Sequence, residues 1–446
     1  MFDIANLLCR SNNSHYFVLT ANIHIMRKVM VTIIFLIVTG LLIFFQYKRE
    51  NNFLNLISIL TIPYFFIVLF NNYIFYRFGF YRINDDVLFM LMGSLVIFFL
   101  GASCVTIKKI PLLREEDNEH RFLQYDIDKM TVSLIVIALI GLLRVYRMYM
   151  SGDFSGSNFD EAEGVAGNGI IGHLMLLSSS ISPVVFLYWL EHKKKISCLI
   201  AVILIILLHF STFIKYNVIG VVVSLFIFTL LYKKSLWIKG VFFLLTSVGF
   251  LFVGNYVIGF LLRNLSVDYF FYVNHLWKYI AGSVIYDQYI FNPGIYTHLS
   301  VAYKLMTFLM GLPNMFITKF FGGEARFFPH IRKPDLPVSN IGELSNVTDA
   351  FGYLYPAHDT LVDILFYYFI IFFIGMLFSW VYVKAKRNSK YFSPFISNFM
   401  TYFVFFNFFG TFYINAGPWE ILVYSLIIPN LFLRKTNLLK GKIHIS

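Results

Sequence analysis

Long apolar runs separated by short polar segments dominate the chain from residue 29 onward. Most runs are about 17 to 24 residues long, the length that an α-helix needs to cross a hydrocarbon core about 30 Å thick. The short alternating segments of a membrane β-barrel are missing from the sequence. The pattern predicts an all-α polytopic integral membrane protein with about 11 transmembrane helices, at 29–47, 53–75, 87–107, 130–150, 170–190, 197–213, 216–232, 239–260, 361–383, 392–410 and 417–433.

One large segment, residues 261–360, interrupts this pattern and holds half of the chain's 12 prolines. Within it, 268–290 and 297–321 have helical apolar spacing but carry too much charge to span, which predicts interfacial helices along the membrane face. The remainder, 322–360, has no regular periodicity. The chain is therefore expected to divide into an N-terminal bundle of about eight spans, the large loop, and about three C-terminal spans with a tail: 1–260, 261–360 and 361–446.

Lysine and arginine are concentrated on one side of the predicted membrane. Of the 36 such residues, 21 fall in short segments assigned to that side: 48–52, 108–129, 191–196, 233–239, 384–391 and 434–446. The opposite short loops, 151–169 and 411–418, hold none. The cation-rich side is predicted to be cytoplasmic, so the large loop faces the outer, periplasm-like space. Arg10, Arg27 and Lys28 are exceptions near the N-terminus, and either Met1 or Met26 is expected to be the natural start.

Composition agrees with this class and excludes others. The chain is 58% hydrophobic and 13% charged, whereas soluble domains are about a quarter charged. The net charge of +12 comes from the short loops, so membrane lipids are expected as partners and nucleic acid is not. No nucleotide-binding or metal-binding motif is present, and no cofactor or metal is predicted. His173 and His209, inside spans, are expected to make polar contacts between helices.

Several cations are predicted on the outer side, where positive charge is otherwise scarce. Each one alone is explained by contact with lipid phosphates. Together they form a candidate site for a phosphate or pyrophosphate, since Arg binds such anions with two N–H groups and Lys as a point charge. The candidate pyrophosphate-binding residues near the ends of spans are Arg144, Arg147, Lys215 and Arg263, and those in the loop above are Arg326 and Arg332.

Acidic residues near the end of the large loop are candidates for a general base. Asp349 is the first choice, because aromatic neighbours are expected to exclude water from it and raise its basicity. Glu343 follows, in a more open stretch. Asp359 comes third, because an acid before a span can simply cap that helix. Asp287, on an otherwise apolar helix, is a further candidate, and each of these acids alone is better explained by a structural role.

The residues around Asp349 carry a resemblance to a known family. Asn346, Val347, Thr348, Phe351, Gly352 and Tyr355, followed by Asp359, lie directly before a predicted span. This run resembles the motif of the Wzy family of O-antigen and oligosaccharide repeat-unit polymerases, which stands at the end of their large periplasmic loop. The chain departs from that motif where Asp349 follows Thr348 directly. The number of spans and the single large outer loop are also similar.

The resemblance implies a membrane glycosyltransferase of the bacterial inner membrane with a periplasmic active face. Such an enzyme transfers a growing glycan from undecaprenyl pyrophosphate to a sugar hydroxyl of the next lipid-linked repeat unit. Its partners are the undecaprenyl-pyrophosphate-linked oligosaccharide and a chain-length regulator. The donor carries its own leaving group, which agrees with the missing nucleotide motif.

Two alternatives remain. An O-antigen ligase uses the same donor and transfers the glycan to lipid A core, and only the motif favours the polymerase. A flippase or transporter of lipid-linked oligosaccharide is expected to place ionisable residues within its spans and to show repeat symmetry. Here the polar residues gather in one outer loop, which argues against transport.

Overall fold

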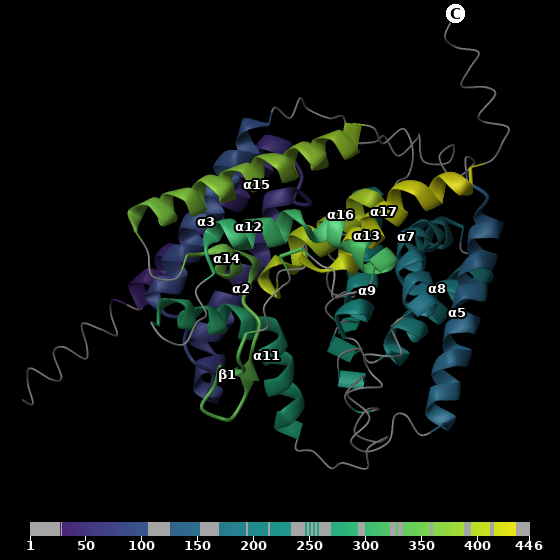
Figure 1. The fold of residues 1–446 in the computed structure, drawn as a ribbon, viewed down its shortest axis with the longest axis horizontal. Helices are drawn as coiled ribbons and strands as arrows, with labels where there is room; N and C mark the ends of the chain where they lie inside the picture. The colour runs from purple at the N-terminus through teal and green to yellow at the C-terminus, as the bar shows by residue number, and fades with distance from the viewer. Residues whose placement is uncertain are drawn as a thin grey trace, which may run out of the picture.

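The protein is mostly helical in the computed structural model shown in Figure 1. The structure describes residues 27, 29–105, 125–151, 169–192, 195–212, 215–232, 246–247, 249–250, 253–254, 257, 269–292, 299–321, 327–328, 333–356, 360–387, 394–410 and 414–433. Six helices in this part are long and apolar enough to cross a membrane: Val29–Glu50, Leu56–Tyr73, Asp85–Cys104, Ile127–Met150, Gly169–Glu191 and Leu361–Ala385. The chain therefore has the architecture of an all-α membrane protein.

The other predicted spans correspond to shorter helices or fall outside the described residues. The sixth and seventh match α8 (Ile196–Ser211) and α9 (Lys215–Tyr232), and the eleventh matches α17 (Ala416–Leu431). Most of the eighth, 239–260, lies outside the described residues. The number of 11 spans thus stays a prediction.

The tenth predicted span is not one regular α-helix. Its Asn398 side chain donates to the carbonyl oxygen of Ser179 at 3.2 Å and to Ser425 Oγ at 2.7 Å, and Ser224 Oγ donates to Asn398 Oδ1 at 2.5 Å. These bonds connect the segment to three neighbouring helices, α7 (Gly169–Glu191), α17 and α9, as polar side chains do between membrane helices. The segment consists of α16 (Phe395–Phe399), the π-helix η7 (Met400–Val404) and the 3-10 helix η8 (Phe405–Phe408).

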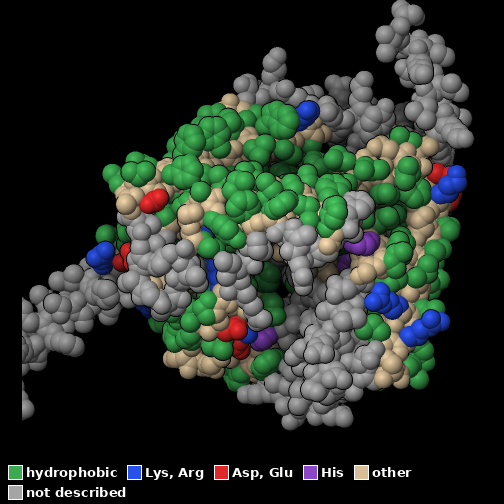
Figure 2. All heavy atoms as spheres, in the orientation of Figure 1, with side chains coloured by type: hydrophobic (Ala, Val, Ile, Leu, Met, Phe, Trp, Pro, Cys, Tyr) green, Lys and Arg blue, Asp and Glu red, His purple; other side chains and the backbone are tan. Residues whose placement is uncertain are grey.

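Helices α3 (Asp85–Cys104) and α15 (Leu361–Arg387) pack closely because glycines lie at their contact. A Cβ on Gly101 would overlap the backbone of Phe372, and one on Gly375 would overlap the backbone of Phe98. Small residues permit this approach in membrane bundles. The other side of α15 exposes a stripe of large apolar side chains at helical spacing, and Figure 2 shows hydrophobic side chains covering it. That surface is suited to lipid.

Buried side chains form two apolar cores. One lies among α5 (Ile127–Met150), α7 (Gly169–Glu191) and α8, with part of α9. The other joins α2 (Leu56–Tyr73), α3 and α15 to η7 and to the large loop, residues 261–360, which is called the late loop below. In Figure 1, α5 lies at one edge of the molecule and the helices of the second core lie toward the opposite edge.

Contacts at one end of the bundle involve segments that the charge pattern assigns to one side. Arg49 Nη2 donates to the carbonyl oxygen of Val105 at 2.6 Å. Lys195 Nζ lies 2.8 Å from Asp128 Oδ1. Each contact joins two connections assigned to the same side: those after the first helix and after α3, and those before α5 and before α8.

The opposite end joins the α2–α3 connection to the late loop. The N–H of Tyr81 donates to the carbonyl oxygen of Val338 at 3.0 Å. The start of the first helix belongs to this end as well, since Arg27 Nε lies 3.4 Å from Asp85 Oδ2. One of the cations that the charge pattern did not explain thus pairs with an acid at the start of α3.

The late loop forms helices where helical spacing predicted them, and it enters the bundle. Trp277 donates from Nε1 to Asn71 Oδ1 at 2.9 Å and stacks on Phe75 with ring centroids 3.9 Å apart. Ala281 and Ile285 are fully buried. One face of the helix that carries Trp277, Ala281 and Ile285 is therefore part of the protein core and does not simply cover its surface. The elements are α11 (Tyr269–Tyr286), η5 (Asp287–Phe291), α12 (Val301–Leu309) and α13 (Gly311–Phe321).

The end of this loop reaches far into the bundle. A short hairpin, β1 (Leu336–Pro337) and β2 (Leu344–Ser345), precedes α14 (Ala350–Leu354). The rings of Phe351 and Tyr64 lie 5.7 Å apart, and Tyr64 is midway along α2. Helix α14 is therefore level with the middle of a membrane-length helix. Polar backbone at that depth is stable only where protein or a polar cavity surrounds it.

Candidate functional site

Asp349 begins α14 and is completely buried. Its backbone is extended, with φ −68° and ψ 176°, and its Oδ1 accepts from the N–H of Gly352 at 2.5 Å. This is the geometry of a helix N-cap, a position that Asp favours. The cap satisfies one carboxyl oxygen and directs the other into the protein.

Asp287 brings a second buried carboxyl group to the same place. It begins η5 and has no exposed surface. Its oxygens lie against Gly352, where a Cβ would overlap them. The carboxyl faces the side chain and backbone N–H of Asp349, although none of these contacts has the geometry of a regular hydrogen bond. Two acids 62 positions apart in the sequence thus form a pair, which we call the Asp287–Asp349 pair.

Lys333 supplies positive charge beside this pair. Its Nζ donates to Thr348 Oγ1 at 2.6 Å and lies 5.1 Å from the centroid of the Tyr353 ring. The charges of Asp287 and Asp349 both act on it. The lysine side chain therefore compensates one negative charge in a place that water scarcely reaches.

Burial controls the acidity of all three groups. It raises the pKa of Asp287 well above its usual range, and the neighbouring Asp349 charge raises it further. Burial also raises the pKa of Asp349, to about 6, against the opposing hydrogen bond from Gly352. Burial lowers the pKa of Lys333 to about 7, although the Asp287 charge opposes this. Asp287 therefore favours its protonated form, while Asp349 is the acid of the pair that ionises at about pH 6.

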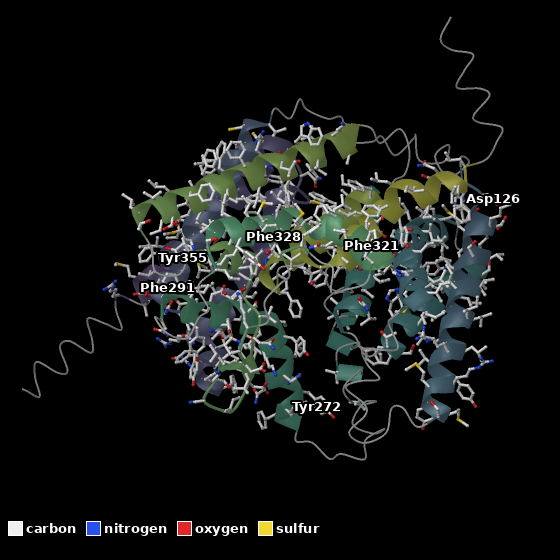
Figure 3. All side chains as sticks on the ribbon, viewed as in Figure 1. Asp126, Tyr272, Phe291, Phe321, Phe328 and Tyr355 are labelled. Carbon is white, nitrogen blue, oxygen red and sulfur yellow. The ribbon has the colours of Figure 1, made fainter. Side chains whose placement is uncertain are left out.

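Aromatic side chains and α12 pack against the segment that carries the pair. Tyr355 packs on Phe291 with centroids 5.4 Å apart, and Figure 3 shows the two side chains close together. Lys304 of α12 donates from Nζ to the carbonyl oxygen of Tyr355 at 2.7 Å. These contacts hold α12 against the segment that carries Asp349. A substrate can reach Asp349 only if some of this cover opens.

Glu343, the second candidate base, lies in a different environment. Its Oε2 is 3.2 Å from Lys278 Nζ and 3.5 Å from His275 Nδ1, both on α11. Burial alone would raise the pKa of Glu343, but His275 and Lys278 outweigh it and lower the pKa. Its charge is thus held by cations of α11, and it is a weaker base than Asp349.

The structure separates part of the predicted pyrophosphate site from the acid pair. Arg144 is partly buried and Arg147 is exposed, and both belong to α5, which packs on α7 and α8. Figure 1 shows α5 across the molecule from α14. The two arginines were grouped with the other cations by depth alone, which does not fix position within the membrane plane. Five other candidates lie outside the described residues or side chains: Asp359, Lys215, Arg263, Arg326 and Arg332.

Sequence reasoning missed the partnership of Asp287, Asp349 and Lys333. Asp287 was noticeable as an acid ending an apolar helix, but nothing in the local sequence connects it to Asp349. Lys333 lies in an irregular stretch without periodicity. The expected contacts of the histidines inside spans are present: His173 Nδ1 lies 2.7 Å from Glu420 Oε1, and His209 Nε2 lies 3.4 Å from Ser178 Oγ.

Comparisons with known proteins give no relative. No family model, no curated protein and no solved structure matches the chain. Among the described residues, no three His, Cys, Asp or Glu side chains are grouped as a metal site would require. The geometry of the site and the motif around Asp349 are therefore the features that point to a function.

Proposed function

We propose that this protein is a membrane glycosyltransferase that polymerises oligosaccharide repeat units carried on a polyprenyl pyrophosphate. The observation that carries the proposal is the Asp287–Asp349 pair. Asp349, inside the motif that resembles the repeat-unit polymerases, is buried beside a second acid and has a pKa of about 6. General bases that act at neutral pH have pKa values in this range.

The proposed reaction exchanges one bond for another. The oxygen of the acceptor hydroxyl attacks the anomeric carbon of the donor glycan, and the bond from that carbon to the pyrophosphate oxygen breaks. The pyrophosphate leaves with the electron pair, and the hydroxyl proton passes to the Asp349 carboxylate. A positioned base of this kind contributes about a hundred- to ten-thousand-fold in rate.

Asp287 and Lys333 favour the ionised form of Asp349, which a general base requires. Asp287 is the acid that favours the protonated form, because burial and the Asp349 charge raise its pKa well above its usual range. A protonated Asp287 stabilises the ionised form of Asp349, which its contact indeed favours. Lys333 adds positive charge beside both acids. The arrangement gives the two acids different roles, one as base and one as proton holder.

A second function, transport of the lipid-linked oligosaccharide, is favoured by one observation. The acid pair is level with the middle of α2, because Tyr64 contacts Phe351 there. Ionisable groups at that depth often serve proton-coupled transport. The motif around Asp349 favours glycosyl transfer over transport.

Deletion of the gene, followed by gel analysis of lipopolysaccharide, tests the proposal. A strain without a repeat-unit polymerase should produce core carrying one repeat unit. A strain without a ligase or a flippase should produce bare core. Complementation with the wild-type gene should restore long chains, and bare core in the deletion strain would exclude the polymerase.

A further inference from the structure

A histidine and a buried acid meet between α7 and α17, away from the acid pair. His173 Nδ1 lies 2.7 Å from Glu420 Oε1. The Glu420 side chain is 4% exposed, whereas that of His173 is 45% exposed. Figure 2 shows histidine at the surface over α7. A carboxylate at Nδ1 fixes the ring and leaves the second nitrogen, Nε2, for another partner.

Arg144 approaches the same end of α7. Its Nη1 is 3.8 Å from the place that a Cβ on Gly169 would occupy. Gly169 begins α7 four residues before His173, so Arg144 lies at the end of α7 that carries His173. Glu420 also contacts Tyr424 of α17. A guanidinium and an imidazole thus lie at the same end of α7, and together they are a donor set for phosphate oxygens.

We propose that Arg144 and His173 bind the pyrophosphate of the acceptor repeat unit, an inference that rests on the proposed function. A polymerase holds two lipid pyrophosphates. The donor pyrophosphate must lie beside Asp349, because it leaves during the reaction. The acceptor reacts at a sugar remote from its lipid, so its pyrophosphate must be held at a distance from the base. Helices α5 and α7 lie across the molecule from α14 in Figure 1 and meet this requirement.

Binding of undecaprenyl pyrophosphate to the purified full-length protein in detergent, measured by native mass spectrometry, tests this assignment. The variant H173Q keeps a polar side chain but cannot become a cation. Loss of one charged hydrogen bond should weaken binding about tenfold or more. The matched control is H192Q, at the other end of α7, where the exposed His192 ring lies 3.3 Å from the carbonyl oxygen of Tyr188; it should bind as the wild type does.

Inorganic pyrophosphate, tested in parallel, shows whether the lipid is required. Equal binding by wild type and H173Q would overturn the assignment.

The binding measurement is independent of polymerisation. If H173Q loses binding but the deletion strain makes bare core, the anion site stands and the proposed glycosyl transfer fails. If the deletion strain makes single-unit core while H173Q binds normally, the transferase stands and the acceptor site is wrong.

Discussion

Asp287 and Asp349 place two buried carboxyl groups against each other at the first turn of α14. Gly352 leaves room for this contact, because the Cβ of any larger residue would overlap the Asp287 carboxyl group. The Asp349 charge raises the pKa of Asp287, whereas the contact from Asp287 lowers the pKa of Asp349, and burial has the largest effect on both. This relationship predicts how activity depends on pH and on the residues around the pair.

Activity should fall as the pH drops below about 6. The pKa of Asp349 is raised to about 6, so above that pH the carboxylate accepts the proton and below it the protonated acid cannot. The pH dependence of kcat/KM, measured with lipid-linked repeat units and purified protein, reports this ionisation for the pair. Full activity at pH 4.5 would contradict a role for this pair.

Lys333→Met should move that loss of activity to higher pH. Lys333 lowers the pKa of Asp287 through its charge, and without it the pair retains its proton more strongly. Lys278→Met is the matched control, because Lys278 pairs with Glu343 instead. The same pH series on both variants checks the prediction. An unchanged profile in Lys333→Met would mean that this lysine does not act on the pair.

Gly352→Ala should reduce activity strongly, because its Cβ overlaps the Asp287 carboxyl group. Gly282→Ala should be tolerated, since a Cβ there meets its neighbours at 3.6 Å and 3.7 Å, ordinary contact distances. Protein level in the membrane and long-chain product are measured for both. Equal activity of the two variants would show that the close approach at Gly352 is unimportant.

Reporter fusions should place the two ends of the bundle on opposite sides. Fusions after residues 120, 193, 236 and 388 are expected to report the cytoplasm, and fusions after 160 and 330 the periplasm. A fusion after residue 79 should agree with the one after 330, because Tyr81 bonds Val338. A cytoplasmic signal after 330 would remove the acid pair from the face where the proposed reaction occurs.

The helices of this fold were predictable because membrane-length apolar runs leave few alternatives. The burial of α11 was not, since an apolar face turned to lipid and one turned to protein have the same composition. Trp277 and Ala281 pack inward, yet their spacing is equally typical of an interfacial helix. Hydropathy reports depth in the membrane but not which neighbour a residue meets.

The candidate site was predictable only where local sequence carries the signal. Asp349 was found through its motif and its aromatic neighbours, and its raised pKa agrees with that expectation. Its contact with Asp287 joins distant parts of the chain, and no local pattern encodes it. Arg144 and Arg147 were assigned by depth, and the structure places them on a helix across the molecule from Asp349.

The most direct test of the account is turnover of lipid-linked repeat units by purified Asp349→Asn. Asn also caps helices well, so α14 should form and the hydrogen bond from Gly352 should persist, but the amide cannot accept the hydroxyl proton. Asp335→Asn, an exposed acid in the same loop, is the control and should turn over normally. We predict a loss of about a hundred- to ten-thousand-fold for Asp349→Asn with donor binding intact. Near-normal turnover by Asp349→Asn would contradict the assignment of this residue as the base.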